Sequence, residues 1–210
     1  MKNTERTEAR KNEILDTAKR LFMEQGYEQT TINDILTASG VAKGSLYYHY
    51  KSKEDVLDGV LERMTGQIAD AAKAVADDPA MTAHEKVFRV ISSVNIAESP
   101  DERMIRELHS PANALLHQKS IAQTIRAVAP IMASVVEQGI REGIYHTQYP
   151  LETVEILLVA SQFIFDEGIF GWTPEEKAAR MTAFIRITET VLGAEQGSFM
   201  LLGGGQAGEK

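Results

Sequence analysis

Residues 31–50 read TINDILTASGVAKGSLYYHY, and this stretch decides the fold of the chain. Its apolar residues follow a helical spacing on both sides of Gly40, which predicts two short helices joined by a tight turn. Thr31 is a good N-cap for the first helix, with Asp34 as its capping-box partner, and the second helix begins near Ala42. This arrangement is typical of a helix-turn-helix, whose second helix enters the major groove of DNA.

The second helix opens with small and polar residues, as a groove-reading helix requires. Small side chains let the backbone approach the groove closely, and a lysine or serine can reach base edges or phosphates. Tyrosine and histidine then offer hydroxyl and ring N–H donors to phosphate oxygens. The alternative interpretation of these residues is a three-helix core with the tyrosines packed inside. For Tyr50 we expect such a buried position.

The charge of the chain is unevenly distributed. The net charge is −8, from 22 Lys and Arg against 30 Asp and Glu, which by itself argues against a nucleic-acid partner. Residues 1–53 nevertheless hold 9 basic and 7 acidic residues, which leaves 13 and 23 for the remainder. The window from Ile35 to Lys53 contains no acidic residue, so the sequence predicts a basic face on an acidic protein.

Residues 8–68, approximately, resemble the DNA-binding domain of the TetR (tetracycline-repressor) family of transcription regulators. The resemblance is carried by Thr31-Ile32 and by the unbroken string ASGVAKGSLYYHYKSKEDVL of residues 38–57. It departs from the family at Leu36, where alanine is frequent, and at Tyr50, where phenylalanine is usual. The resemblance implies a ligand-responsive repressor that binds a palindromic operator as a homodimer, with an activator or a helical interaction module as the alternatives.

The resemblance also assigns roles to individual residues of the DNA-binding domain. Five residues would face the bases, and four would hold the phosphates. The first group is Ala42, Lys43, Gly44, Ser45 and Tyr47, and the second is Thr31, Tyr48, His49 and Lys53.

The rest of the chain also has helical patterns, and no segment is typical of a strand. We therefore expect an all-α protein, in which a three-helix helix-turn-helix domain is joined to a helical C-terminal domain for ligand binding and dimerisation. The expected boundaries are 1–53 and 54–193, followed by a flexible glycine-rich tail at 194–210. Pro130 is expected to kink or break a long helix, and Thr173-Pro174 is expected to start the last one.

The second domain is expected to hold a small-molecule effector that the sequence does not identify. Pocket candidates are the polar groups and large apolar side chains of its helices, although each also fits an ordinary helix residue. We expect the helix at 151–165, apolar nearly all round, and the last helix to form a dimer interface. The pocket candidates are Asn95, Met104, His109, Asn113, His117, Gln162, Phe163, Asp166 and Trp172.

Several classes of protein are excluded by what the sequence lacks. It has no cysteine, and His109 and His117 do not have a metal-ligand spacing, so we expect no metal and no cofactor. It has no Walker A, GxSxG or HExxH motif, and the GxGxxG match in the tail has neither strand nor helix around it. No secretory signal or membrane-length apolar run is present, so we expect a cytoplasmic protein that is not an enzyme.

Overall fold

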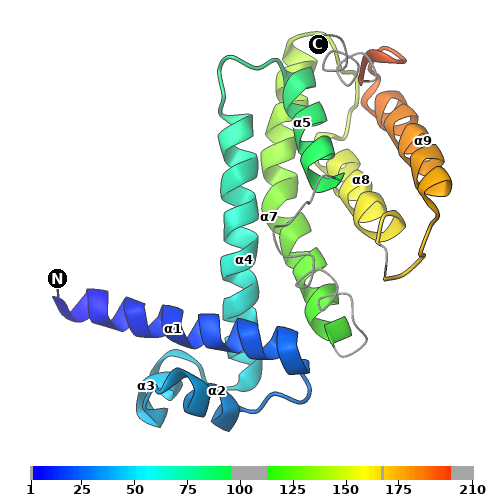
Figure 1. Ribbon diagram of the computed structural model, residues 1–210. Helices are drawn as coiled ribbons and strands as arrows, with labels where there is room; N and C mark the ends of the chain where they lie inside the picture. The colour runs from blue at the N-terminus through cyan, green and yellow to red at the C-terminus, as the bar shows by residue number, and fades with distance from the viewer. Residues whose placement is uncertain (1, 96–112, 167, 200–210) are drawn as a thin grey trace, which may run out of the picture. The chain divides into compact units, whose positions relative to one another are not determined.

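The computed structural model describes residues 2–95, 113–166 and 168–199, and within them the chain forms eight α-helices and no strand (Figure 1). This confirms the expected all-α class. The contacts divide the chain into two compact units, Met1–Gly66 with Ser99–Gln123, and Gln67–Glu98 with Thr124–Lys210. The first unit thus extends beyond residue 53, where the sequence placed the boundary.

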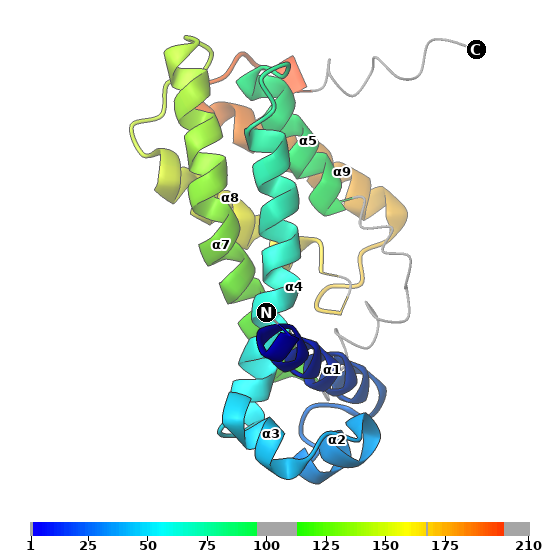
Figure 2. The ribbon, with the colours of Figure 1, turned by 90° about the vertical axis from the view of Figure 1, so that its left-hand side faces the viewer.

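The first unit contains the helix-turn-helix. Helix α1 (Lys2–Gln25) packs on α2 (Ile32–Ser39) and α3 (Lys43–His49), and Figures 1 and 2 both show the two short helices against one side of α1. The first part of α4 (Lys53–Ala76) and the beginning of α7 (Ala114–Arg141) complete the unit.

Local signals set the ends of these helices as expected. Thr31 forms a full capping box with Asp34, in which its hydroxyl accepts from the Asp34 amide and the carboxylate accepts from the Thr31 amide. Gly26 and Gly40 follow α1 and α2 with φ of 89° and 67°, a left-handed conformation that glycine adopts without strain. The Ser52 hydroxyl accepts from the Asp55 amide at the start of α4.

The apolar faces of these helices meet in one core. Phe22, Ile35, Leu46 and Leu57 are fully buried there, one from each of the four N-terminal helices. Leu116, from the beginning of α7, is part of the same core. A residue far along the sequence therefore helps to hold the helix-turn-helix.

The second unit is built from the remaining helices. The rest of α4 packs with α5 (Ala83–Asn95) and the rest of α7, and α8 (Pro150–Ile164) lies beside α9 (Pro174–Leu192). Thr173 caps α9 through a capping box with Glu176, as its sequence predicted.

Helix α7 runs through Pro130 as one element, so of the two expected outcomes, a kink or a break, the break does not occur. The proline ring removes one amide donor, but the buried residues on both sides of it, Ala129 and Met132, keep the helix packed in the core.

Tyr145 anchors the turn that follows α7. Its side chain is fully buried against Gly139, where an added Cβ atom would overlap the ring Cδ2 atom. Glycine is therefore required at 139 by the ring that covers it.

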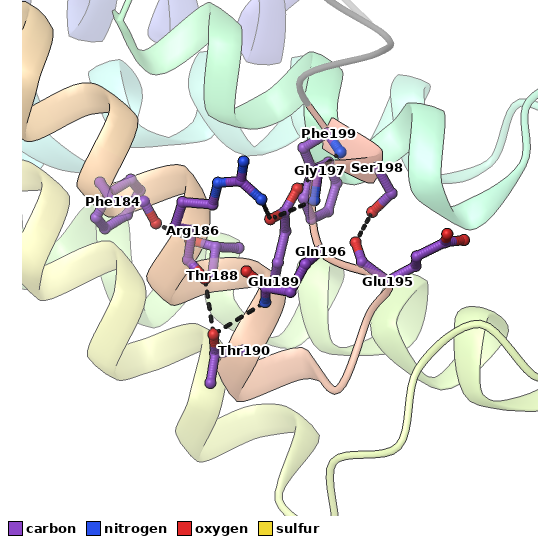
Figure 3. Close-up of polar contacts among 10 residues, drawn as sticks. All are labelled: Phe184, Arg186, Thr188, Glu189, Thr190, Glu195, Gln196, Gly197, Ser198 and Phe199. Atoms are coloured by element: carbon purple, nitrogen blue, oxygen red, sulfur yellow. Dashed lines mark hydrogen bonds and ion pairs between the residues drawn. The ribbon is translucent and has the colours of Figure 1, made fainter.

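Residues 194–199, here called the C-terminal segment, are folded onto this unit, although the sequence placed them in a flexible tail. The carboxylate of Glu189, fully buried on α9, accepts from the amides of Gly197 and Phe199 at 2.9 and 3.0 Å (Figure 3). Phe199 is also buried, and its ring stacks on that of His84 with centroids 4.0 Å apart. Residues 194–199 are thus ordered by a buried carboxylate and a ring stack, and 200–210 lie outside the described residues.

Candidate nucleic-acid interface and effector pocket

Helix α3 has one buried face and one exposed face. Leu46 points into the core, while Ala42, Lys43 and Gly44 are exposed and Ser45 is half-buried. The exposed face continues through Tyr47 and Tyr48, which are 44% and 80% exposed, whereas large aromatic side chains are ordinarily buried. The small and polar residues at the start of α3 and the two tyrosines after them thus form one continuous exposed surface along the helix.

The tyrosines of this region have different environments. The Lys43 ammonium lies over the Tyr47 ring at 5.9 Å from its centroid, within cation–π range, and His49 meets the Tyr48 ring edge-on at 5.0 Å. Tyr50 is buried, as expected, and burial raises the pKa of its hydroxyl to about 12. Tyr50 therefore belongs to the core, and Tyr47 and Tyr48 belong to the surface.

Thr31 and Lys53, both assigned to phosphates from the resemblance, have protein partners. The Thr31 hydroxyl donates to Asp34 Oδ2 at 2.7 Å, and that hydrogen bond lowers the pKa of the Asp34 carboxyl. Lys53 Nζ donates to the carbonyls of Tyr27 and Glu28 at 2.9 and 3.3 Å and lies 4.2 Å from the Tyr27 ring centroid. Lys53 is thus also a structural link between α4 and the turn after α1.

Two residues near the beginning of α7, which sequence reasoning did not connect with the helix-turn-helix, also stabilise the first unit. Asn113 is buried, and its Oδ1 accepts from the Tyr27 amide at 3.0 Å. Lys119 on α7 donates to Glu54 and Asp58 of α4 at 2.8 and 3.1 Å. Sequence reasoning missed this role of Asn113 because the partner is 86 residues away and no local pattern marks it.

The second unit contains a pocket between α5, α7, α8 and α9 with a volume of about 50 Å³. Of the eleven described residues that line it, nine are aliphatic, methionine or phenylalanine, and none is charged. The lining residues are Val87, Val90, Met132, Val136, Val154, Leu157, Leu158, Ser161, Phe184, Thr188 and Leu192.

The six candidates whose side chains the structure describes do not line this pocket. Met104 and His109 lie outside the described residues, and Asn95 lies at the last residue of α5. Asn113 belongs to the first unit, together with His117. The other four lie on α8 and the loop after it: Gln162, Phe163, Asp166 and Trp172. A role for any candidate in ligand binding remains a prediction.

A second hollow, a groove of about 300 Å³, runs along α8 and α9. Large apolar side chains are exposed around it, with Ile156 of α8 at 68% and Ile187 of α9 at 55%. Beyond one end of α8, the Trp172 ring lies between Phe170, stacked at 5.0 Å, and the Arg180 guanidinium, 3.3 Å from its centroid. Large apolar side chains exposed together on one face are typical of an interaction surface.

Comparison with known proteins assigns the chain to a class that fits this geometry. Residues 14–60 match the family described as "Bacterial regulatory proteins, tetR family", and residues 95–187 match "Tetracyclin repressor-like, C-terminal domain". The protein is a DNA-binding transcriptional regulator of the helix-turn-helix class. Within that class, the chain belongs to the TetR family.

Three relatives illustrate the likeness. The chain is 26% identical to the fatty acid metabolism regulator protein of Bacillus subtilis, covering 81% of this chain and 87% of the relative. It is 28% identical to the transcriptional repressor KstR2 of Rhodococcus jostii, over 68% and 71%. The solved SmeT–triclosan complex shares the fold, with a TM-score of 0.66, 21% identity, and coverage of 90% and 94%.

The family membership confirms that this is a regulator and not an enzyme. Among the helices that the structure describes, none is long and apolar enough to cross a membrane. The same part of the chain holds no cluster of three or more His, Asp or Glu side chains that could bind a metal ion.

Proposed function

We propose that this protein is a cytoplasmic, effector-responsive repressor that binds a palindromic operator as a homodimer. The observation that carries the proposal is the exposed face of α3, where Lys43, Tyr47 and Tyr48 present polar groups within the acid-free window of the sequence. The acidic remainder of the chain would repel DNA from other faces and so orient the docking.

The base contacts are assigned to Ala42, Lys43, Gly44, Ser45 and Tyr47, at the start and along the exposed face of α3. Phosphate contacts are assigned to Tyr48 and His49, and to Thr31 and Lys53. Because the last two already have protein partners, we expect them to contact phosphates while also holding the ends of α2 and α4.

The partner subunit is a second copy of the chain, packed on the apolar face of α8 and α9. The exposed isoleucines and the groove of about 300 Å³ between the two helices support this assignment, since packing against the same face of a second copy would bury them. A dimer of this kind reads two half-sites about 34–36 Å apart or a multiple of that distance. Light scattering on a size-exclusion column tests it, and a monomer at micromolar concentration would contradict it.

The effector is assigned to the pocket between α5, α7, α8 and α9. For a response, the effector must bind more tightly to the form that does not hold DNA, because equal affinity for both forms shifts nothing. The name of one relative, a fatty acid metabolism regulator, supports a small-molecule signal of metabolic origin.

The proposal is tested first by fluorescence anisotropy with labelled DNA from upstream of the protein's own gene. We expect a saturable complex that competitor DNA does not remove, with an affinity that falls as salt increases. If no specific complex forms at low salt, the chain is a helical interaction module and the proposal fails. A reporter gene behind the bound site separates the repressor, which lowers expression, from an activator.

Gly44 provides a sharper test of groove reading. An added Cβ atom at Gly44 meets nothing within 4 Å, so Gly44→Ala should stabilise the fold by about 0.5–1 kcal/mol through helix propensity. If α3 approaches the bases closely, the same variant should weaken operator binding by about 1–3 kcal/mol. Gly66→Ala on α4, equally open, is the matched control, since it should stabilise the fold and leave operator binding unchanged.

A further inference from the structure

The lining of the pocket in the second unit restricts the chemistry of what can enter it. Among the described residues that line it, the side chains with a hydrogen-bonding oxygen or nitrogen are Ser161 of α8 and Thr188 of α9. Both are buried, and the other nine lining residues offer only apolar surface. A ligand in this pocket therefore gains most of its affinity from apolar burial.

Both hydroxyls already use their hydrogen atoms within their own helices. Ser161 Oγ donates to the Leu158 carbonyl at 2.9 Å. Thr188 Oγ1 donates to the Phe184 carbonyl at 2.8 Å (Figure 3). Each oxygen keeps its lone pairs and can only accept a further hydrogen bond. A polar group of the ligand that pairs with either oxygen must therefore be a donor, such as an alcohol hydroxyl.

None of the described residues that line the pocket carries a charge that could pair with a charged group of the ligand. The charged neighbours of Thr188 on α9 are Arg186 and Glu189, which pair with each other at 3.6 Å. The Glu189 carboxylate also accepts two backbone amides of the C-terminal segment, so neither residue is available to a ligand (Figure 3). The free energy needed to bury an unpaired carboxylate or ammonium is far larger than the free energy gained by contact with the apolar walls.

The size of the pocket restricts the ligand further. A volume of about 50 Å³ holds roughly four water molecules, which is the space of a chain of about four to six carbons once the walls adjust. The flexible side chain of Met132 in the wall allows such an adjustment.

We infer that this pocket binds a small, uncharged aliphatic molecule whose polar group, where it has one, is a hydrogen-bond donor. The inference rests on the proposed effector response and gives that effector a chemical class. It excludes free carboxylic acids, phosphates and amines as ligands of this pocket, because their charged forms dominate at neutral pH.

The experiment uses the full chain without DNA, so that it does not depend on operator binding. The protein is labelled with ¹³C-methyl methionine and titrated with 1-butanol, 1-hexanol and 1-octanol, and with hexanoate and hexylammonium as charged counterparts. We expect a saturable shift of the Met132 methyl resonance with the alcohols, and affinity rising about fourfold for each added methylene until the pocket is full. We expect no saturable shift of that resonance with hexanoate or hexylammonium.

Two reporters locate the binding. Met132 lines the pocket, whereas the single tryptophan, Trp172, stacks on Arg180 beside the groove of α8 and α9. Binding that changes Trp172 fluorescence and leaves Met132 unchanged would place the alcohols in the groove and overturn the inference. Hexanoate that matches 1-hexanol at Met132 would overturn it as well.

A pair of variants on α8 provides the matched control. Val154→Phe adds volume inside the pocket and should abolish the response of Met132 to 1-hexanol. Val159→Phe makes the same change at an exposed position of the same helix that lines neither hollow, and should leave the response intact. If Val154→Phe does not fold, the comparison of alcohol with hexanoate on the unmodified chain still decides.

The outcomes separate this inference from the proposed function. A chain that binds 1-hexanol at Met132 but no operator DNA would keep the inference and refute the regulator. A chain that binds its operator while Met132 responds to none of the alcohols would keep the regulator and refute the inference.

Discussion

Helix α3 and the pair α8–α9 both expose large side chains, but of different chemistry. On α3 they are Tyr47 and Tyr48, whose rings end in hydroxyls and lie in a stretch without acidic residues. On α8 and α9 they include Ile156 and Ile187, which have no polar atom. A surface that binds phosphates and base edges needs polar groups to hydrogen-bond with them. A surface that packs against a second copy of itself does not need such groups. Exposure alone therefore does not identify an interface; the chemistry of the exposed atoms does.

The largest effect is expected from placing charge on the α8–α9 face. Ile156→Glu combined with Ile187→Glu should convert the dimer to a monomer, because the new carboxylates would be buried without partners. Loss of the second half-site contact should lower operator affinity by about 100-fold or more. Light scattering measures the first effect and fluorescence anisotropy the second.

The matched control for this change is Ile68→Glu on α4. Ile68 is 47% exposed and lines neither hollow, so the same substitution should leave both the mass and the operator affinity unchanged. A double variant that stays dimeric would show that α8 and α9 do not form the interface, and the contrast drawn above between the two surfaces would fail.

Two helix glycines sharpen the same contrast by responding in opposite ways to alanine. Gly44 on α3 faces open space, whereas Gly139 on α7 is covered by the Tyr145 ring. Gly139→Ala forces ring or backbone to move and should destabilise the protein by about 3 kcal/mol, against a gain for Gly44→Ala. Thermal and urea unfolding measure both. Equal stabilisation by the two substitutions would show that the packing of the Tyr145 ring does not require a glycine at position 139.

The sequence predicted the DNA-binding half well because its signals are local. The capping box at Thr31 and the left-handed Gly40 depend on residues within a few positions of each other. The capping box at Thr173, in the second unit, was predictable for the same reason. The exposed face of α3 likewise comes from one contiguous stretch, so a helical wheel is sufficient to find it.

The pocket could not be predicted in the same way. Its walls come from four helices, with Val87 and Leu192 more than a hundred positions apart, and nothing local indicates that they meet. Sequence reasoning also searched for polar residues in apolar helices, whereas the walls are almost entirely aliphatic. Asn113, a candidate whose side chain is buried, instead accepts from the Tyr27 amide in the first unit.

The reading surface of α3 is expected to be sensitive residue by residue. Lys43→Ala and Tyr47→Ala should each weaken specific operator binding by about 1–3 kcal/mol, with little change in binding to unrelated DNA. Tyr149→Ala, which removes a tyrosine that is 64% exposed in the second unit, is the control and should change neither. Equal losses on specific and unrelated DNA would make Lys43 and Tyr47 phosphate contacts.

Lys53→Ala should behave differently from these two. It should weaken binding to all DNA sequences alike, and it should also lower the melting temperature, because Lys53 Nζ bonds the carbonyls of Tyr27 and Glu28. Unchanged stability would show that the two carbonyl contacts contribute nothing to the first unit, and would leave Lys53 a phosphate contact alone.

The smallest effect is expected in the second unit, from the pH dependence of His84. Burial lowers the pKa of this histidine, opposed in part by the Ser198 backbone, Glu189 and Glu85, and its Nδ1 lies 3.1 Å from the Tyr145 hydroxyl. The unfolded chain, with a histidine pKa near 6.5, then binds a proton more readily than the folded one. The stability due to neutral His84 is therefore complete above about pH 6.5 and is lost as pH falls through the lower folded value.

Unfolding measured between pH 7.5 and 5 should show this loss, on top of that from the carboxylates. His84→Gln cannot take up the proton, so its stability should fall less steeply with decreasing pH than that of the unmodified chain. His84 stacks on Phe199, so protonation of His84 should release the C-terminal segment before the rest of the protein unfolds. At low pH, the backbone amides of this segment should therefore exchange with solvent faster than those of α3, which is not held by a stack of this kind.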